Sequence, residues 1–178
     1  MGILKEPEIV DKVVLEVARK MVVAARTAPK TRGRNTIETL IIKGKDRKQL
    51  ADQMKQLGKD SGAHYFGRDG ENILRAPAIV LIGTKIQPMD LPACGLCGFS
   101  DCKTKKEHPE NPCAFNNIDL GIAIGSAVSV AMDNRIDNRV MYTIGMAALK
   151  LELLGPGVKI AMGIPLSATS KNIFFDRK

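Results

Sequence analysis

The chain has 178 residues with a formal net charge of +8 at pH 7, and 44% of its residues are hydrophobic. This length and apolar content predict one domain, residues 1–178, with its own core. The sequence contains no run of eighteen uncharged apolar residues, which a transmembrane helix would need. The opening residues do not resemble a signal peptide. We therefore expect a cytoplasmic protein without a membrane anchor.

The positive charge predicts an acidic partner, which could be nucleic acid, an acidic redox protein or an anionic cofactor. Aromatic residues make up 4% of the chain and tryptophan is absent. No stretch alternates aromatic side chains with Arg or Lys, as a base-stacking surface would. These observations argue against nucleic acid and favour an acidic redox partner protein.

The first predicted element is a helix from about Pro7 to Arg26, because its apolar residues recur at intervals of three and four. The pair Ala28-Pro29 ends it. A basic loop with Lys30, Arg32 and Arg34 around Gly33 follows and leads into a predicted strand, Ile37 to Ile42. Such a loop could hold a phosphate or carboxylate, or could be a solvated connector.

The next predicted helix runs from Asp46 to Leu57, with Gly58 as its stop signal. His64 is a lone histidine beside two aromatic residues and is more typical of a packed surface residue than of a metal ligand. Ile79 to Gly83 is continuously apolar, which predicts a buried central strand. Pro88 and Pro92 then introduce a cysteine-rich segment.

That segment, residues 93–115, holds all four cysteines of the chain: Cys94, Cys97, Cys102 and Cys113. Their spacing is C-x2-C-x4-C-x10-C. Four thiolates on one short loop are the ligand set of an iron–sulfur cluster. Gly95 and Gly98 lie beside ligands, where the backbone must bend closely around an inorganic core.

Other interpretations of the cysteines compete with a cluster. A structural zinc is the second, although only the first pair has the C-x2-C form typical of zinc knuckles. Disulfides are the third, and they would require an oxidising compartment. Four unrelated buried cysteines would be scattered along the chain.

After the cysteines, residues Asp119 to Met132 predict a helix. It is apolar on nearly all sides and rich in Gly, Ala and Ser, so we expect it to be wholly buried. Asn116, Asn117 and Asp119 are candidate caps at its start. An extended piece within residues 134–145, a helix from Met146 to Leu154 and a strand from Val158 to Ile164 follow. We expect the tail, with Phe174 and Phe175, to pack on the domain or on a second subunit.

This order of elements predicts an α+β or α/β three-layer domain with an inserted four-cysteine loop, residues 88–116. The loop sequence CGLCGFSDC, followed by NPC, resembles the [4Fe-4S] motif of electron-transfer subunits and corrinoid iron–sulfur proteins. The resemblance implies that Cys94, Cys97, Cys102 and Cys113 hold a single cluster.

Most of the chain is also similar to a family of uncharacterised prokaryotic proteins described as containing a ferredoxin domain. The segments that carry this similarity are AARTAPKTRG, FGRD, CGLCGFSDC, IAIGSAVS, IDNRVMYTIG and GIPLS followed by KNIFFDR. The family resemblance implies the cluster and no particular reaction.

The layout of elements, more loosely, resembles nitroreductase-like flavoproteins, which are α+β homodimers that bind flavin mononucleotide (FMN) at the subunit interface. That resemblance implies a homodimer in which Arg26, Lys30, Arg32 and Asn35 lie near the flavin and the turn Tyr142 to Gly145 lies near its phosphate. The chain departs from the pattern at its start. It has Lys5 and Glu6 where those flavoproteins have an Arg-Arg-Ser type sequence that binds the flavin phosphate.

Three functional hypotheses result from these patterns. The first is a [4Fe-4S] electron-transfer protein, and the second is a flavin-dependent oxidoreductase in which the cluster relays electrons. The third is a zinc-stabilised interaction module or nucleic-acid-binding module. With His64 and His108 as the only histidines, the sequence suggests no hydrolytic site.

Overall fold

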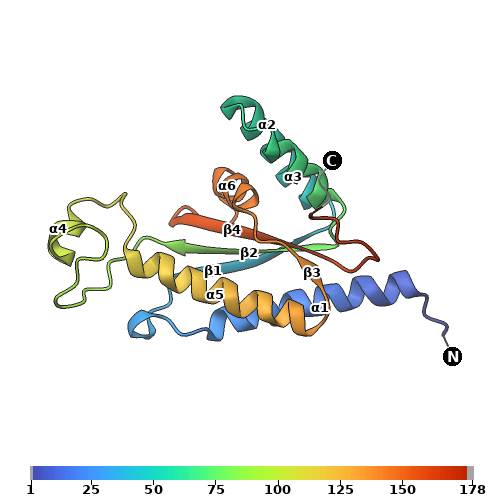
Figure 1. Ribbon diagram of the computed structural model, residues 1–178, viewed down its shortest axis with the longest axis horizontal. Helices are drawn as coiled ribbons and strands as arrows, with labels where there is room; N and C mark the ends of the chain where they lie inside the picture. Colours follow the sequence, from blue (N-terminus) through green and yellow to red (C-terminus); the bar gives the residue numbers. More distant parts are fainter. Residues whose placement is uncertain (1, 176–178) are drawn as a thin grey trace.

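The computed structural model describes residues 2–175, which form a central antiparallel sheet between two layers of helices (Figure 1). The strands are β1 (Ile37–Lys43), β2 (Ala78–Lys85), β3 (Asp137–Asn138) and β4 (Val158–Ser167). Their order in the sheet is β1-β2-β4-β3. The predicted three-layer α+β domain is therefore confirmed, with β2 as the buried central strand that its sequence indicates.

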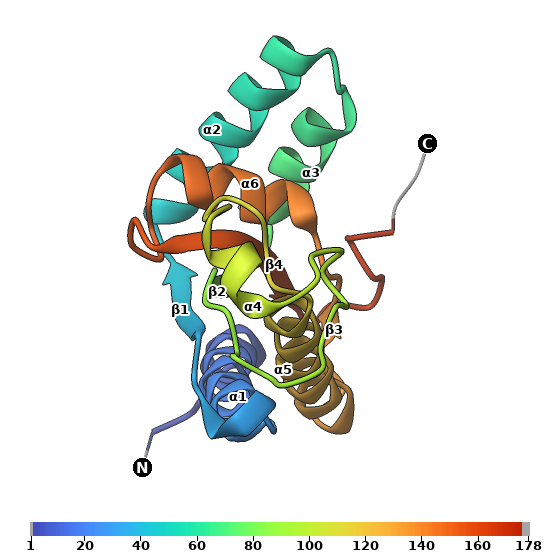
Figure 2. The same ribbon diagram turned by 90° about the vertical axis from the view of Figure 1, so that its left-hand side faces the viewer.

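The two faces of the sheet carry separate hydrophobic cores because successive side chains of a strand point to opposite sides. On β2, Val80 and Ile82 face one core, while Ile79 and Leu81 face the other. Helices α1 (Glu6–Thr27) and α5 (Ala114–Asp133) cover the first face. Helices α2 (Asp46–Ser61), α3 (Tyr65–Leu74) and α6 (Tyr142–Lys150) cover the second (Figure 2).

Helix α1 and the strands lie where the sequence predicts them, but several helix boundaries differ. Helix α2 continues past Gly58, which is buried against Phe66, and ends at Ser61. The next residue, Gly62, has a left-handed φ of 70°. The prediction of Gly58 as the stop was wrong because a helical glycine can also serve close packing. Helix α3 occupies a segment for which we predicted no element.

Helix α5 begins five residues earlier than predicted, at Ala114, so Asn116, Asn117 and Asp119 lie inside it rather than capping it. The prediction that it is wholly buried was also wrong. Its outer side exposes 45% of Ile118, 39% of Ile122 and 63% of Met132. By length and composition this helix could cross a membrane, a property that core helices of soluble proteins share, and its inner side packs on α1 and the sheet.

Helix α6 covers residues Tyr142–Lys150, whereas the prediction was Met146 to Leu154. The predicted turn Tyr142 to Gly145 is instead its first turn, and the expected extended piece is β3 just before it. The tail packs on the domain as expected: Ile173 and Phe174 belong to the second core, while Phe175 is half exposed.

Candidate functional site

The four cysteines lie on a long loop between β2 and α5 that projects from one end of the sheet (Figure 1). Cys94 and Cys97 are in its irregular first half. Cys102 opens the short helix α4 (Cys102–Lys106), and Cys113 is the buried N-cap residue of α5. All four are free thiols, and the first three are partly exposed. The disulfide alternative therefore has no support in the structure.

The loop bends sharply around Cys97. The amide N–H of Gly98 donates to the carbonyl of Gly95 across 3.0 Å, and Gly98 has a φ of 86°. A side chain at Gly98 would be strained at that φ, so a glycine is needed for the turn. Further along, the Asp101 side chain caps α4 by accepting from the Thr104 amide N–H across 2.8 Å.

The loop offers the right donors for a four-thiolate cluster but does not hold them in a ligating arrangement. Among residues 2–175, no three His, Cys, Asp or Glu side chains are arranged to hold a metal ion. A cluster would therefore require the loop to draw its thiols together. One other group within the loop is suited to an anion: Lys105, whose side chain is fully buried.

The basic loop after α1 is in contact with the cysteine loop. The Arg32 guanidinium donates to the carbonyl oxygens of Met89 and Asp90 across 3.0 and 3.1 Å. The Asp90 carboxylate in turn pairs with Lys106 of α4 at 2.7 Å and with Arg34 at 3.6 Å. The hydrogen bond from Lys106, with the charge of Arg34, lowers the pKa of Asp90.

Two further contacts fix the base of the cysteine loop. The buried Asp119 carboxylate of α5 accepts from the backbone N–H and the hydroxyl of Thr31, at 3.0 and 2.9 Å. The Asn116 side-chain oxygen accepts from the Gln87 amide N–H across 2.8 Å. The start of the cysteine loop is thus held by Arg32 of the basic loop and by Asn116 of α5. Its other end, where α5 begins, is tied to the basic loop through Asp119.

Three of the four residues near α1 that were predicted to bind flavin, Lys30, Arg32 and Asn35, form hydrogen bonds within the chain. The Lys30 ammonium donates to the carbonyls of Ala25, Arg26 and Ala28 at 2.7–3.0 Å and so caps the end of α1. Burial lowers the pKa of Lys30. The Asn35 amide donates to the Ile37 carbonyl. The Arg26 side chain is exposed.

The other two predicted flavin residues, Tyr142 and Gly145, lie on α6, across the sheet from the basic loop. Gly145 packs so tightly on β4 that a Cβ there would lie 1.8 Å from the Ala161 carbonyl oxygen. The six predicted residues are therefore split between the two faces of the sheet and do not form one pocket within a subunit.

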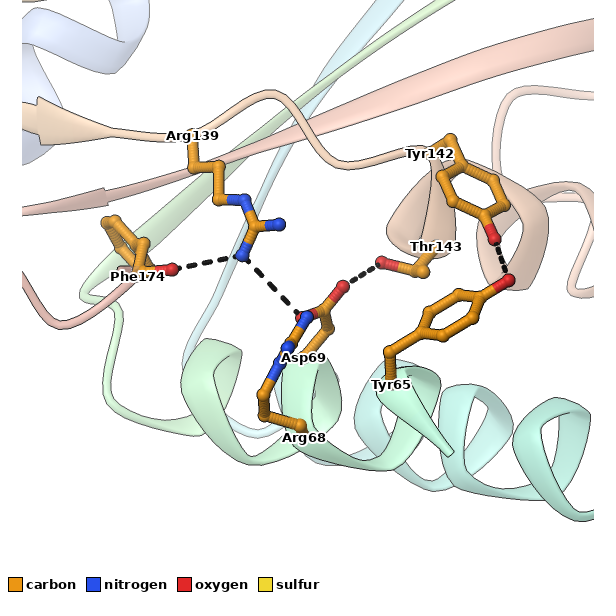
Figure 3. A network of polar contacts seen from close by, with 7 residues as sticks. All are labelled: Tyr65, Arg68, Asp69, Arg139, Tyr142, Thr143 and Phe174. Carbon is orange, nitrogen blue, oxygen red and sulfur yellow. Dashed lines mark hydrogen bonds and ion pairs between the residues drawn. The ribbon is translucent and has the colours of Figure 1, made fainter. Parts of the chain in front are cut away.

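A buried polar network joins three segments that the sequence analysis did not connect (Figure 3). The Asp69 carboxylate of α3 accepts from the Thr143 hydroxyl at 2.9 Å and from Arg68 at 3.0 Å, and it lies 3.8 Å from Arg139. Arg139 also donates to the Phe174 carbonyl of the tail. These residues come from FGRD, DNRVMYT and KNIFF, three of the segments that carry the family resemblance. Their common membership in that set of segments is the sequence signal that could have indicated their contact.

A surface pocket of about 610 Å³ lies at the opposite end of the fold from the cysteine loop, beside the start of α1 and the end of β4. Its lining includes Arg75, Arg135 and Ser167. The Ser167 hydroxyl is buried and has no hydrogen-bond partner within residues 2–175, which is uncommon for a buried polar group. Acidic side chains, Glu6, Asp11 and Asp137, share the lining.

Comparison of the fold with solved structures defines its class. A nitroreductase with bound FMN from Bacteroides fragilis aligns with a TM-score of 0.63 at 12% identity, over 92% of this chain and 81% of that one. A BluB-like flavoprotein from Clostridium difficile aligns with a TM-score of 0.59 at 20% identity, over 96% and 86%. The fold is nitroreductase-like.

Sequence comparison places the chain in a family. An uncharacterized protein of Archaeoglobus fulgidus is 40% identical over 98% of this chain and 97% of its own length. Residues 110–177 match the model of the family described as uncharacterized protein containing a ferredoxin domain (DUF2148). The chain belongs to this family, as the sequence resemblance predicted. The match includes Cys113 but not the three earlier cysteines.

Proposed function

We propose that this protein is an electron-transfer protein in which Cys94, Cys97, Cys102 and Cys113 hold one [4Fe-4S] cluster. The observation that carries the proposal is the placement of all four free thiols, three of them partly exposed, on one loop held at both ends. The ferredoxin-domain description of the family supports it. When bound, such a cluster supplies reversible electron transfer.

The chain's own residues have three roles in this proposal. The cysteines would ligate iron, while the contacts from Arg32 and Asn116 limit how far the loop can move. The exposed lysines of α4, Lys103 and Lys106, would face an acidic donor or acceptor protein, in keeping with the net charge of +8. Docking by surface charge should weaken as salt rises.

The test is metal and sulfide analysis of the protein purified without oxygen. We expect about four iron atoms and four sulfides per chain and a brown colour that dithionite bleaches. Cys97→Ala should lose the cluster, while Ser100→Ala, a change of similar size in the same loop, should keep it. A colourless wild type with one zinc ion per chain would overturn the proposal in favour of a structural zinc.

We propose, as a second candidate, an FMN-dependent oxidoreductase, because of the pocket lined by Arg75, Arg135 and Ser167. Its volume suits a cofactor, and the unpaired Ser167 hydroxyl and two guanidinium groups suit phosphate. It ranks second because the acidic lining opposes an anion. The 20 residues of α5 also separate this pocket from the cysteine loop by roughly 30 Å, which makes a relay within one subunit long.

FMN titration, followed by quenching of flavin fluorescence, tests this candidate and locates its site. If FMN binds in the pocket, Arg75→Met should weaken binding and Arg26→Met should not. The reverse result would favour the flavin residues predicted from the sequence at the end of α1 and in the basic loop. Absence of binding to the wild type would exclude the flavin candidate and leave the cluster proposal unaffected.

A further inference from the structure

Lys105 is the one lysine of α4 whose side chain points into the protein. Its side chain is 2% exposed, while Lys103 and Lys106 on the same short helix are exposed. Lysine is rarely this buried, because an ammonium group loses its hydration on leaving water. A fully buried lysine within a loop of four cysteines therefore requires a physical reason.

The buried ammonium has little to compensate its charge. Its Nζ donates to the carbonyl of His108 across 3.2 Å. Within residues 2–175 no carboxylate lies within 4 Å of it, whereas Lys106 and Arg34 nearby both pair with Asp90. A buried cation that has only a neutral acceptor is destabilising unless an anion completes its environment.

The acceptor itself is held in place. The His108 ring stacks on Phe99 with centroids 5.0 Å apart. Phe99 precedes Cys102 and His108 follows α4, so the stack closes this part of the loop around Lys105. Its ammonium is therefore positioned before any ligand binds, which reduces the entropy lost when an anion arrives.

We infer that Lys105 is the internal counter-charge for an anionic metal–thiolate group bound by the four cysteines. This inference rests on the proposed cluster. A cluster with four thiolates is anionic, and the electron that it takes from a donor protein adds one more negative charge without making or breaking a bond. A fixed positive charge therefore favours the reduced form and raises the reduction potential.

The experiment compares three variants after anaerobic reconstitution with iron and sulfide. Lys105→Met removes the charge at similar side-chain length, and Lys105→Arg keeps it. Lys103→Met is the matched control, with the same loss of charge at an exposed position of the same helix. The measurements are iron and sulfide content, the midpoint potential from a redox titration, and the unfolding temperature of each protein without iron.

We expect Lys105→Met to lower the equilibrium constant for reduction of the cluster about tenfold. This corresponds to a midpoint potential lower by about 59 mV for a one-electron couple. Lys103→Met should shift it far less because solvent screens that charge, and Lys105→Arg should stay near the wild type. Without iron, Lys105→Met should unfold at the same temperature as the wild type or higher, since an uncompensated buried charge is gone. Lower cluster content in Lys105→Met but not in Lys105→Arg would also support the inference.

Two results would overturn the inference. The first is a potential in Lys105→Met that equals that of Lys103→Met. The second is a lower unfolding temperature without iron, which would make Lys105 a structural cap for the end of α4. Failure of the wild type to take up iron and sulfide is a different result, because it would reject the proposed function itself.

Discussion

Asp90 is the residue through which the basic loop and the cysteine loop are joined by charge. Its carboxylate pairs with Lys106 and Arg34, while Arg32 holds its backbone carbonyl. The basic residues singled out in the sequence as an anion site thus support the loop that carries the cysteines. Their positive charges are already partly compensated by this one carboxylate.

Asp90→Asn should loosen the cysteine loop at neutral pH. The hydrogen bond from Lys106 lowers the pKa of Asp90 from its ordinary value of 3.8. The stabilisation that the Asp90 carboxylate gives to the loop is therefore fully present above pH 3.8. It is lost as the pH falls through the lower pKa of Asp90 in the folded protein. In the wild type we expect the same loosening only below pH 3.8.

Hydrogen exchange of residues 86–106 would measure this effect. The matched control is Glu71→Gln, which removes an exposed ion pair with Lys55 between α2 and α3, on the other face of the sheet. Faster exchange in Asp90→Asn alone is expected. Equal exchange of the loop in both variants would contradict a role for Asp90.

Tyr142 provides a second prediction for a single residue. Its hydroxyl donates to that of Tyr65 (Figure 3), and this hydrogen bond raises the pKa of Tyr142 to about 12. Because the chain has 2 tyrosines, absorbance near 295 nm reports on this pair alone. In Tyr65→Phe we expect the pKa of Tyr142 to return toward 10.0.

The sign of the associated pH dependence is opposite to that of Asp90. A raised pKa means that the contribution of Tyr142 to stability is present below pH 10 and is lost as the pH rises through about 12. Tyr65→Phe should therefore lessen the loss of stability in that alkaline range. An unchanged titration in Tyr65→Phe would show that the tyrosine pair is not the cause.

Helix α6 approaches β4 unusually closely, and two glycines make this approach possible. A Cβ on Gly145 would lie 1.8 Å from the Ala161 carbonyl oxygen, and one on Gly163 would lie 2.1 Å from a methyl group of Ile144. The backbone of Met141 also pairs with that of Gly163. The glycine of the YTIG segment therefore serves packing.

Gly145→Ala should destabilise the fold by about 1–3 kcal/mol or more, because the clash is with backbone that cannot move aside. Gly67→Ala is the control, since this glycine is also in a helix and a Cβ there would meet no atom within 4 Å. The control should be neutral or slightly stabilising. Urea denaturation measures both, and similar midpoints for the two variants would contradict the packing role.

At the scale of the whole molecule, the outer side of α5 is an apolar surface that one subunit leaves uncovered. Between Asp119 and Asp133 the helix has no charged residue. Gly121 and Gly125 on it have open space beside them, so another helix could approach closely. We propose that a second copy of the chain covers this side, which would make the protein the homodimer that the nitroreductase resemblance implies.

Ile122→Glu should convert this dimer to a monomer, because it places a charge in the centre of the proposed contact. Leu74→Glu, on α3 at the other face of the sheet, should leave the dimer intact. Sedimentation equilibrium measures the mass of each variant. A monomeric wild type, or a dimer that persists in Ile122→Glu, would contradict this interface.

The sequence by itself determined those elements that a pattern of neighbouring residues specifies. The three-and-four spacing of apolar residues placed α1, the continuous apolar run placed β2, and the spacing of the four cysteines identified the candidate site. The family came from a resemblance spread over several segments of the chain. Helix boundaries at Gly58 and Tyr142 were wrong because glycine and β-branched residues weaken a helix signal that tertiary packing then overrides.

Only the tertiary structure decided which distant residues meet. It joined Arg32 to Asp90, assembled the network around Asp69, and split the predicted flavin residues between two faces of the sheet. It also placed Lys105 inside the loop, with no anionic partner in the part of the chain that the structure describes. Such contacts depend on how strands and helices are layered, and no local run of residues encodes that layering, because each side chain's environment comes mostly from segments far away in the chain.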